Sequence, residues 1–195
     1  MKETIEKEQL EFYEKVRSFT EETTQLRTDY WYDYSNLSTW QFWVILLFMF
    51  IVPLVVLYFF IDRKKIFLIG FYGFNIHVWF GYIDSWGNNK GLWGYPYELI
   101  PLIPGSLSLD AALIPILFML VYQWTHHHRK NYYLYSIGLS LILSFVLKPI
   151  LVMHNLFVLH KWVHYYHFFI AYCLVFLFSK LITNIFITMQ KKGAN

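Results

Sequence analysis

The chain has 195 residues, of which 57% are apolar, 22% aromatic and only 15% charged, whereas soluble globular domains carry about 25% charged residues. Its formal net charge of +3 conceals a split, because residues 1–39 hold five basic and nine acidic residues and the basic excess belongs to short segments between apolar runs. Lys and Arg that flank apolar runs form no solvent-facing patch, which excludes the usual basis for nucleic-acid binding.

Residues 1–38 are expected to form an amphipathic helix followed by a linker. Apolar or neutral residues spaced three and four apart make one stripe, and Glu and Lys occupy the other faces: Ile5, Gln9, Phe12, Val16, Phe19, Thr23, Leu26 and Tyr30. Two interpretations stay open. The stripe packs on the bundle or on membrane lipids, or it mediates homo-oligomer formation or the binding of a protein partner.

Five apolar windows then follow, each long enough to cross bilayer hydrocarbon, which needs roughly 20 residues. Nothing resembles the alternating ten-residue strands of a membrane barrel, so the predicted fold class is all-α, an integral membrane helical bundle. The expected spans are residues 40–61, 66–83, 107–124, 132–153 and 164–187, within a bundle at 39–190 that precedes a basic tail at 191–195. Pro53 should kink the first span, and Lys148 with Pro149 should interrupt the fourth.

Orientation follows from the basic segments. The clusters at 63–65, 129–130 and 191–192 fall on one side of the membrane, and loops rich in Lys and Arg stay cytoplasmic. We therefore expect a multi-pass protein of the cell membrane with a cytoplasmic C-terminus. The N-terminal helix and the loops 84–106 and 154–163 would then be extracytoplasmic.

An ordered set of residues runs through the chain from Trp40 to His164. It comprises Trp40, Gln41, Trp43, Pro53, Asp62-Arg63-Lys64, GLWGYPYELIPLIP at 91–104, Asp110, Pro115, FMLVYQ at 118–123, Ser144-Phe145, Pro149, Trp162 and His164. Over residues 30–182 this set resembles a family of small multi-pass membrane proteins common in spore-forming Firmicutes, which has no assigned activity. The resemblance implies the membrane fold and no reaction. Lys148 stands where the family places a glutamate before the proline, so a site that depends on that carboxylate is not carried over.

Two seams of small or polar residues are expected to face protein and not lipid. They are Gly73, His77 and Gly81 on the second span, in register with Asp84, and Ser136, Ser140 and Ser144 on the fourth, in register with Lys148. Small residues at three- and four-residue steps let helices approach closely, which is the packing interpretation. The alternative is a substrate path along the seam.

Charged residues at the extracytoplasmic helix ends are candidates for one ligand pocket. Asp84, Glu98, Asp110, Lys148 and His164 meet there under the predicted topology, and ionisable groups at membrane depth either pair with one another or serve function. The apolar loop 91–105 has three prolines and three glycines, and its rings Trp93 and Tyr95 belong to the same candidate set. This loop either anchors at the interface or dips back as a lid.

No metal site and no cofactor are expected. His160, His164 and His167 would share a helical face if the fifth span began early, but no carboxylate or Cys accompanies them, and an interfacial polar rim is the preferred interpretation. Cys173 is the only cysteine, and phosphate-binding, dinucleotide-binding, zinc-protease and nucleophile-elbow motifs are absent from the sequence.

Three functions remain open. The leading hypothesis is a non-catalytic membrane component that binds a lipid-like or small-molecule ligand, or a protein partner, at its outer face. The first alternative is an enzyme that modifies a lipid or an isoprenoid, with Asp84, Glu98 or Asp110 as general acid and Trp93 or Tyr95 stabilising a cation. The second alternative is a small transporter or channel subunit.

Overall fold

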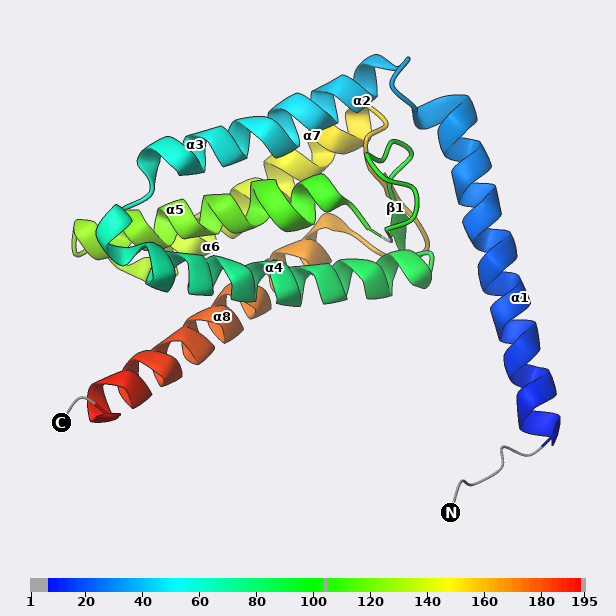
Figure 1. Cartoon of the computed structure of the whole chain (residues 1–195). Coiled ribbons are helices and arrows are strands. Elements are labelled where there is room, and N and C mark those ends of the chain that lie inside the picture. Colours follow the sequence, from blue (N-terminus) through cyan, green and yellow to red (C-terminus); the bar gives the residue numbers. More distant parts are fainter. Residues whose placement is uncertain (1–6, 104, 194–195) are drawn as a thin grey trace.

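The computed structural model describes residues 7–103 and 105–193, and within them the chain is almost entirely helical. Five helices are long and apolar enough to cross a membrane, namely Trp40–Phe60, Arg63–Asn89, Leu109–His127, Tyr132–Met153 and Tyr165–Gly193. The predicted all-α bundle of five spans is thereby confirmed (Figure 1). Ile5, Pro104 and the last two residues of the basic tail lie outside the described residues.

Three of the spans are built from consecutive helical segments. The first joins α2 (Trp40–Val44), η2 (Ile45–Ile51) and α3 (Val52–Phe60), the third joins η4 (Leu109–Leu113) and α5 (Ile114–His127), and the fourth joins α6 (Tyr132–Ile142), η5 (Leu143–Leu147) and α7 (Lys148–Met153). The second span consists of the short turn η3 (Arg63–Lys65) and α4 (Ile66–Asn89), and the fifth is α8 (Tyr165–Gly193).

A widened π-helical turn precedes each proline inside a span. Proline lacks an N–H group and its ring clashes with the carbonyl four residues earlier, so the turn before Pro53, Pro115 or Pro149 has to open. In the fourth span the N–H of Lys148 accordingly reaches the carbonyl of Leu143, five residues back. The interruption expected at Lys148 and Pro149 does not occur, because the helix continues through this turn to Met153.

The second span is longer than the sequence predicts. Helix α4 runs to Asn89 and not to residue 83, so Asp84 lies inside a helix and not in the following loop. Short turns join the first span to the second and the third to the fourth at one end of the bundle, which we call the basic end for its clusters at 63–65, 129–130 and 191–192.

The long connections from the second span to the third and from the fourth to the fifth lie at the opposite end, which we call the α1 end because helix α1 (Lys7–Tyr30) lies across it. They pair through two short antiparallel strands, β1 (Trp93–Gly94) and β2 (Val158–Leu159), with Trp93 opposite Leu159 and Gly94 opposite Val158. This pairing ties the loop after α4 to the loop before α8. Whether loop 91–105 anchors at the membrane interface or dips back as a lid stays a prediction.

Helix α1 (Lys7–Tyr30) continues into the π-helical turn η1 (Trp31–Ser35) and lies across the α1 end of the bundle, with its N-terminal half projecting beyond the spans (Figure 1). No residue of α1 is buried. Phe12 is 69% and Phe19 67% exposed, so the stripe leaves an apolar face open. Its association with lipid or with a partner stays a prediction.

The bundle is apolar outside and partly polar inside. Large apolar side chains such as Phe59 and Phe67 are 73% and 91% exposed. In contrast, Lys148 and several hydroxyl side chains are fully buried between the helices. This inverted distribution suits a bundle surrounded by lipid.

Candidate functional site

Asp84 on α4 is the acceptor around which the site is built. Its Oδ1 accepts hydrogen bonds from the indole Nε1 of Trp93 at 2.8 Å and from the hydroxyl of Tyr95 at 2.6 Å. Its Oδ2 accepts a bond from the backbone N–H of Ser106 at 3.2 Å. Several donors therefore converge on this one carboxylate, and hydrogen bonds to a carboxylate are among the stronger ones in proteins.

Two glycines make room for these contacts. A Cβ on Gly87 would stand 2.0 Å from two ring atoms of Trp93, so only glycine lets the indole lie against α4 and reach Asp84. Gly105 has a φ of +94°, and a Cβ there would stand 2.4 Å from Oδ2 of Asp84. The strand pair β1–β2 holds the segment that carries Trp93 and Tyr95.

Asp110 lies in the widened turn η4, and its carboxyl group is hydrogen-bonded to that of Asp84. Two carboxyl groups can form such a bond only if one carries a proton. Since Asp84 already accepts three other bonds, the proton belongs to Asp110. Backbone bonds hold η4 in place, because Asp110 N–H donates to the carbonyl of Ser106 at 2.8 Å and the Asp110 carbonyl contacts Nδ1 of His77 at 2.8 Å.

Lys148 brings a cation from the fourth span into the same region. Its side chain is fully buried, and Nζ lies 3.6 Å from the ring centroid of Phe157 and 4.9 Å from that of Phe168. Nζ has no hydrogen-bond partner among the described residues. Its charge is balanced electrostatically by the carboxyl pair, with which it interacts at longer range. We call Asp84, Asp110 and Lys148 the Asp–Lys cluster.

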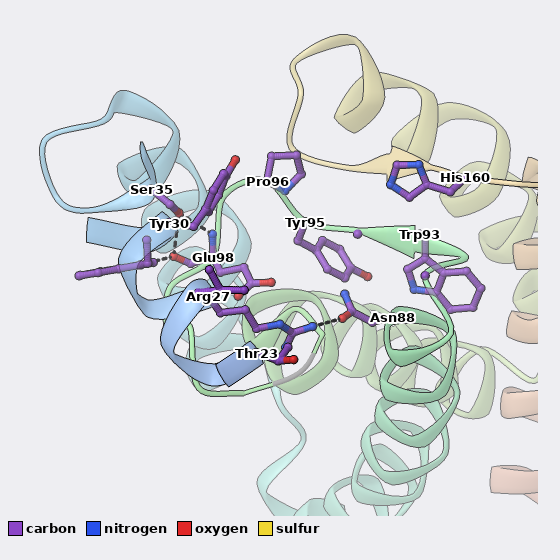
Figure 2. A pocket seen from close by; sticks show the side chains of 14 residues that line it. Thr23, Arg27, Tyr30, Ser35, Asn88, Trp93, Tyr95, Pro96, Glu98 and His160 are labelled. Carbon is purple, nitrogen blue, oxygen red and sulfur yellow. Dashed lines mark hydrogen bonds between the residues drawn. The ribbon is translucent and has the colours of Figure 1, made fainter. Parts of the chain in front are cut away.

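A pocket of about 360 Å³ lies beside the cluster, between α1–η1 and the segment that follows α4 (Figure 2). Rings make up much of its wall, and Arg27, Asn88, Glu98 and His160 contribute polar groups; the rings belong to Tyr30, Trp31, Trp93 and Tyr95. We call it the α1 pocket. Trp93 and Tyr95 therefore separate the α1 pocket from the Asp–Lys cluster, since both also donate to Asp84.

Glu98 is anchored to η1 by its backbone. Its N–H donates to the hydroxyl of Ser35 at 2.9 Å, and its carbonyl accepts a bond from Nε1 of Trp31 at 2.9 Å. Burial raises the pKa of the Glu98 carboxyl to about 8, although the positive charge of Arg27 opposes this shift. Glu98 is therefore mainly neutral at pH 7.

Arg27 and Tyr95 complete the polar wall of the α1 pocket. The guanidinium Nη2 of Arg27 donates to Oδ1 of Asn88 at 2.6 Å, which fixes α1 to the end of α4 (Figure 2). Burial, reinforced by the charge of Asp84, raises the pKa of Tyr95 well above its usual value. The Tyr95 hydroxyl thus remains a hydrogen-bond donor over the physiological range.

The structure brings together most, but not all, of the predicted pocket residues. Asp84, Trp93, Tyr95, Asp110 and Lys148 meet in and around the cluster, and Glu98 lies in the adjoining α1 pocket. His164 does not join them. It is exposed just before α8, and its Nδ1 contacts the carbonyl of Trp162 at 2.7 Å.

The predicted seams differ from each other. Ser136, Ser140 and Ser144 are fully buried, as a protein-facing seam requires. On α4, a Cβ on Gly73 would overlap Met119, which indicates close packing against α5, whereas Gly81 has no heavy atom within 4 Å of that position. The packing interpretation therefore does not hold at Gly81, which lines a shallow groove together with His77.

The imidazoles are not arranged as a metal centre. Because α8 begins at Tyr165, His160 and His164 precede the helix and cannot share a helical face with His167. Within residues 7–103 and 105–193, no group of three or more His, Cys, Asp or Glu side chains is placed to hold a metal ion.

Several residues of the site were not predicted. Phe157 and Phe168 enclose Lys148, Arg27 and Ser35 belong to the α1 pocket, and Ser106 donates to Asp84. For Arg27 alone the sequence offers a signal, because a basic residue stands there on the otherwise apolar side of α1. Comparisons with protein-family models, curated proteins and solved structures find no match for this chain, so function has to be inferred from the site's own residues.

Proposed function

We propose that this chain is a ligand-binding component of the cell membrane and that the α1 pocket takes a small anionic molecule with an apolar or aromatic body. The pocket supports this proposal directly. It is concave, it is walled by four aromatic rings, and its volume of about 360 Å³ falls in the range of small-molecule sites.

The polar groups of the pocket favour an anion. Arg27 carries a permanent positive charge and a planar guanidinium suited to carboxylate, sulfonate or phosphate groups. Among the described residues that line the pocket, Glu98 has the one carboxyl group, which is mainly neutral at pH 7 because its pKa is raised to about 8. It can therefore donate a hydrogen bond without repelling a negative ligand.

The proposal includes the orientation of the chain. All three Lys- and Arg-rich clusters lie at the basic end, and cytoplasmic loops carry the excess of these residues. The α1 pocket would then open on the extracytoplasmic side. A ligand could reach it from that side or from the outer leaflet, which accommodates a lipid-like headgroup.

The lipid-modifying alternative has less support. Asp84 and Asp110 are only 2% and 7% exposed, and Asp84 is already occupied by bonds from Trp93, Tyr95 and Ser106. A general acid must come within hydrogen-bonding reach of its substrate. The carboxyl pair is better suited to holding the wall of the pocket in place.

Benzenesulfonate is a suitable probe, because it is soluble and its charge does not change with pH. We expect isothermal titration calorimetry to show that the full-length chain in detergent binds benzenesulfonate. Arg27→Gln should weaken this binding about tenfold, because it removes one charge-assisted hydrogen bond to the ligand. Arg17→Gln is the matched control, since Arg17 lies on the same helix, exposed and paired with Glu14 and Glu21. Equal affinities in the two variants, or tighter binding of benzyltrimethylammonium, would contradict the proposal.

A further inference from the structure

Several buried polar side-chain atoms in the described part of the bundle lack a hydrogen-bond partner. Six buried side-chain atoms that lack a hydrogen-bond partner among the described residues are Asp110 Oδ1, Tyr122 OH, Ser144 Oγ, Lys148 Nζ, Tyr172 OH and Ser179 Oγ. Each buried unpaired group costs about 1–3 kcal/mol, so such groups are rare and call for an explanation. They come from the third, fourth and fifth spans, and we call them with their neighbours the polar seam.

The fourth span forms one side of the polar seam. Tyr132, Ser136, Ser140, Ser144 and Lys148 follow at four-residue steps, and none is more than 9% exposed. Four residues of helix rise about 6 Å. One water molecule between two hydroxyls makes two hydrogen bonds of about 2.8 Å each, which covers such a step.

Helix α8 forms the opposite side. Tyr172, Ser179 and Thr183 are fully buried along it. The Ser140 hydroxyl of α6 donates to the carbonyl of Ser136 at 2.8 Å and accepts a hydrogen bond from the thiol of Cys173 on α8. Tyr172 also interacts electrostatically with the carboxyl pair of the Asp–Lys cluster. The seam is therefore continuous with the cluster at the α1 end.

Tyrosines mark the other end of the seam. The Tyr132 hydroxyl lies 2.6 Å from that of Tyr72 and donates to the carbonyl of Phe176 at 3.2 Å. The Tyr72 ring stacks on Tyr122 with centroids 4.4 Å apart, and Nζ of Lys180 lies 4.5 Å from the Tyr122 ring centroid. Polar side chains thus reach from one end of the bundle to the other.

Both ends of the seam meet the surface. At the α1 end, Asp110 lines an open groove of about 310 Å³ together with His77, Gly81 and Tyr82. At the basic end, Tyr122 lines a small crevice together with His126. The two openings lie at opposite ends of the third span, because Asp110 is in its first turn and His126 in its last.

We propose that the polar seam is a proton path through the bundle, with water molecules bridging its hydroxyls. Intramembrane carboxyl and amino groups commonly mark such relays. The Asp–Lys cluster holds two protons on three groups, one on Asp110 and one on Lys148. When a proton enters at the carboxyl pair from the groove, Lys148 releases its own proton to a water of the seam and takes up a proton from the carboxyl pair, so the cluster again holds one proton on Asp110 and one on Lys148.

The test is proton flux into vesicles that contain the full-length chain and a trapped pH-sensitive dye, driven by a potassium gradient with valinomycin. We expect flux at least tenfold above that of protein-free vesicles. Ser144→Ala removes an unpaired hydroxyl of the seam and should reduce the flux at least tenfold. Thr188→Ala removes a hydroxyl on the exposed face of α8 and should leave the flux unchanged.

Flux from the folded wild-type chain that equals the protein-free background would overturn the proposal. Equal flux in Ser144→Ala and Thr188→Ala would overturn it as well. Thermal unfolding of each variant in detergent establishes that it is folded. If Ser144→Ala fails to fold, Ser179→Ala removes another unpaired hydroxyl of the same seam and takes its place, with the same expected loss.

Discussion

Replacing each carboxyl group of the Asp–Lys cluster by its isosteric amide should have unequal consequences. In Asp110→Asn the new amide can still donate to Asp84, as the protonated carboxyl does, and Lys148 keeps its counter-charge. We expect a loss of stability below about 1 kcal/mol. In Asp84→Asn the charge is removed from the group that accepts bonds from Trp93, Tyr95 and Ser106.

The expected loss of unfolding free energy in Asp84→Asn follows from the burial of the two charged groups. Asp84 is 2% exposed and Lys148 fully buried, so water screens neither charge. Removing one partner of a buried charge pair costs about 3–5 kcal/mol. Part of that cost arises because the amide N–H₂ would face the N–H of Ser106, which already donates to Oδ2 at 3.2 Å.

Equilibrium unfolding in mixed detergent micelles, followed by circular dichroism, measures both free energies on the full-length chain. Asp84→Asn should be the more destabilising variant by at least about 2 kcal/mol, the difference between the two estimates above. Equal losses in the two variants, or a larger loss in Asp110→Asn, would refute the assignment of the proton to Asp110.

Three further outcomes are expected. Gly87→Ala places a Cβ 2.0 Å from the Trp93 ring and should lower the free energy of unfolding by about 1–3 kcal/mol. In the control variant Gly70→Ala, on the same helix, the Cβ meets no atom within 4 Å, so this free energy should not change. Equal effects in the two variants would count against the packing described for the indole. Tyr95→Phe removes a bond of 2.6 Å to a charged acceptor and should cost about 1.5–3 kcal/mol in the same unfolding assay, and a neutral result would show that this bond contributes nothing. Because the pKa of Glu98 is raised to about 8, this carboxyl becomes negative as the pH rises through that value, and benzenesulfonate affinity should fall between about pH 7 and about pH 9. The fall should disappear in Glu98→Gln, and a fall of the same size in that variant would assign the titration to another group.

The membrane fold could be predicted because it depends on composition and segment length. Each span is a long apolar run, and lipid leaves helices as the remaining solution once barrel strands are absent from the sequence. The ends of the spans were harder to predict. Asp84 was placed after its helix because a charged residue suggests a boundary, but buried donors from Trp93 and Tyr95 let α4 continue to Asn89.

The meeting of Asp84, Asp110 and Lys148 could be anticipated from topology alone. Antiparallel spans place these three residues at the same end of the bundle, and charged groups buried there are stable only when they pair with one another. The strand pair β1–β2 could not be anticipated, because two-residue strands carry no periodicity that a sequence reveals. Without that pairing there was no reason to place Phe157 against Lys148.

The widened turns illustrate a different limit of prediction from the sequence. A proline inside a span signals a disturbed helix, and Pro149 was accordingly expected to interrupt the fourth span. The structure keeps the helix continuous and opens the turn that leads to Lys148. The position of a disturbed helical turn can be predicted from a proline in the sequence, whereas tertiary packing decides how the backbone accommodates that proline.

A protonated carboxyl group inside the bundle is the feature on which the site depends, and infrared spectroscopy detects its carbonyl stretch directly. The measurement is made near pH 7 on the Glu98→Gln variant, because Glu98 would otherwise contribute its own protonated band. We predict a protonated-carboxyl band that disappears when Asp110→Asn is added. A spectrum without that band, or a band that survives this second substitution, would contradict the assignment of a proton to Asp110 in its hydrogen bond with Asp84.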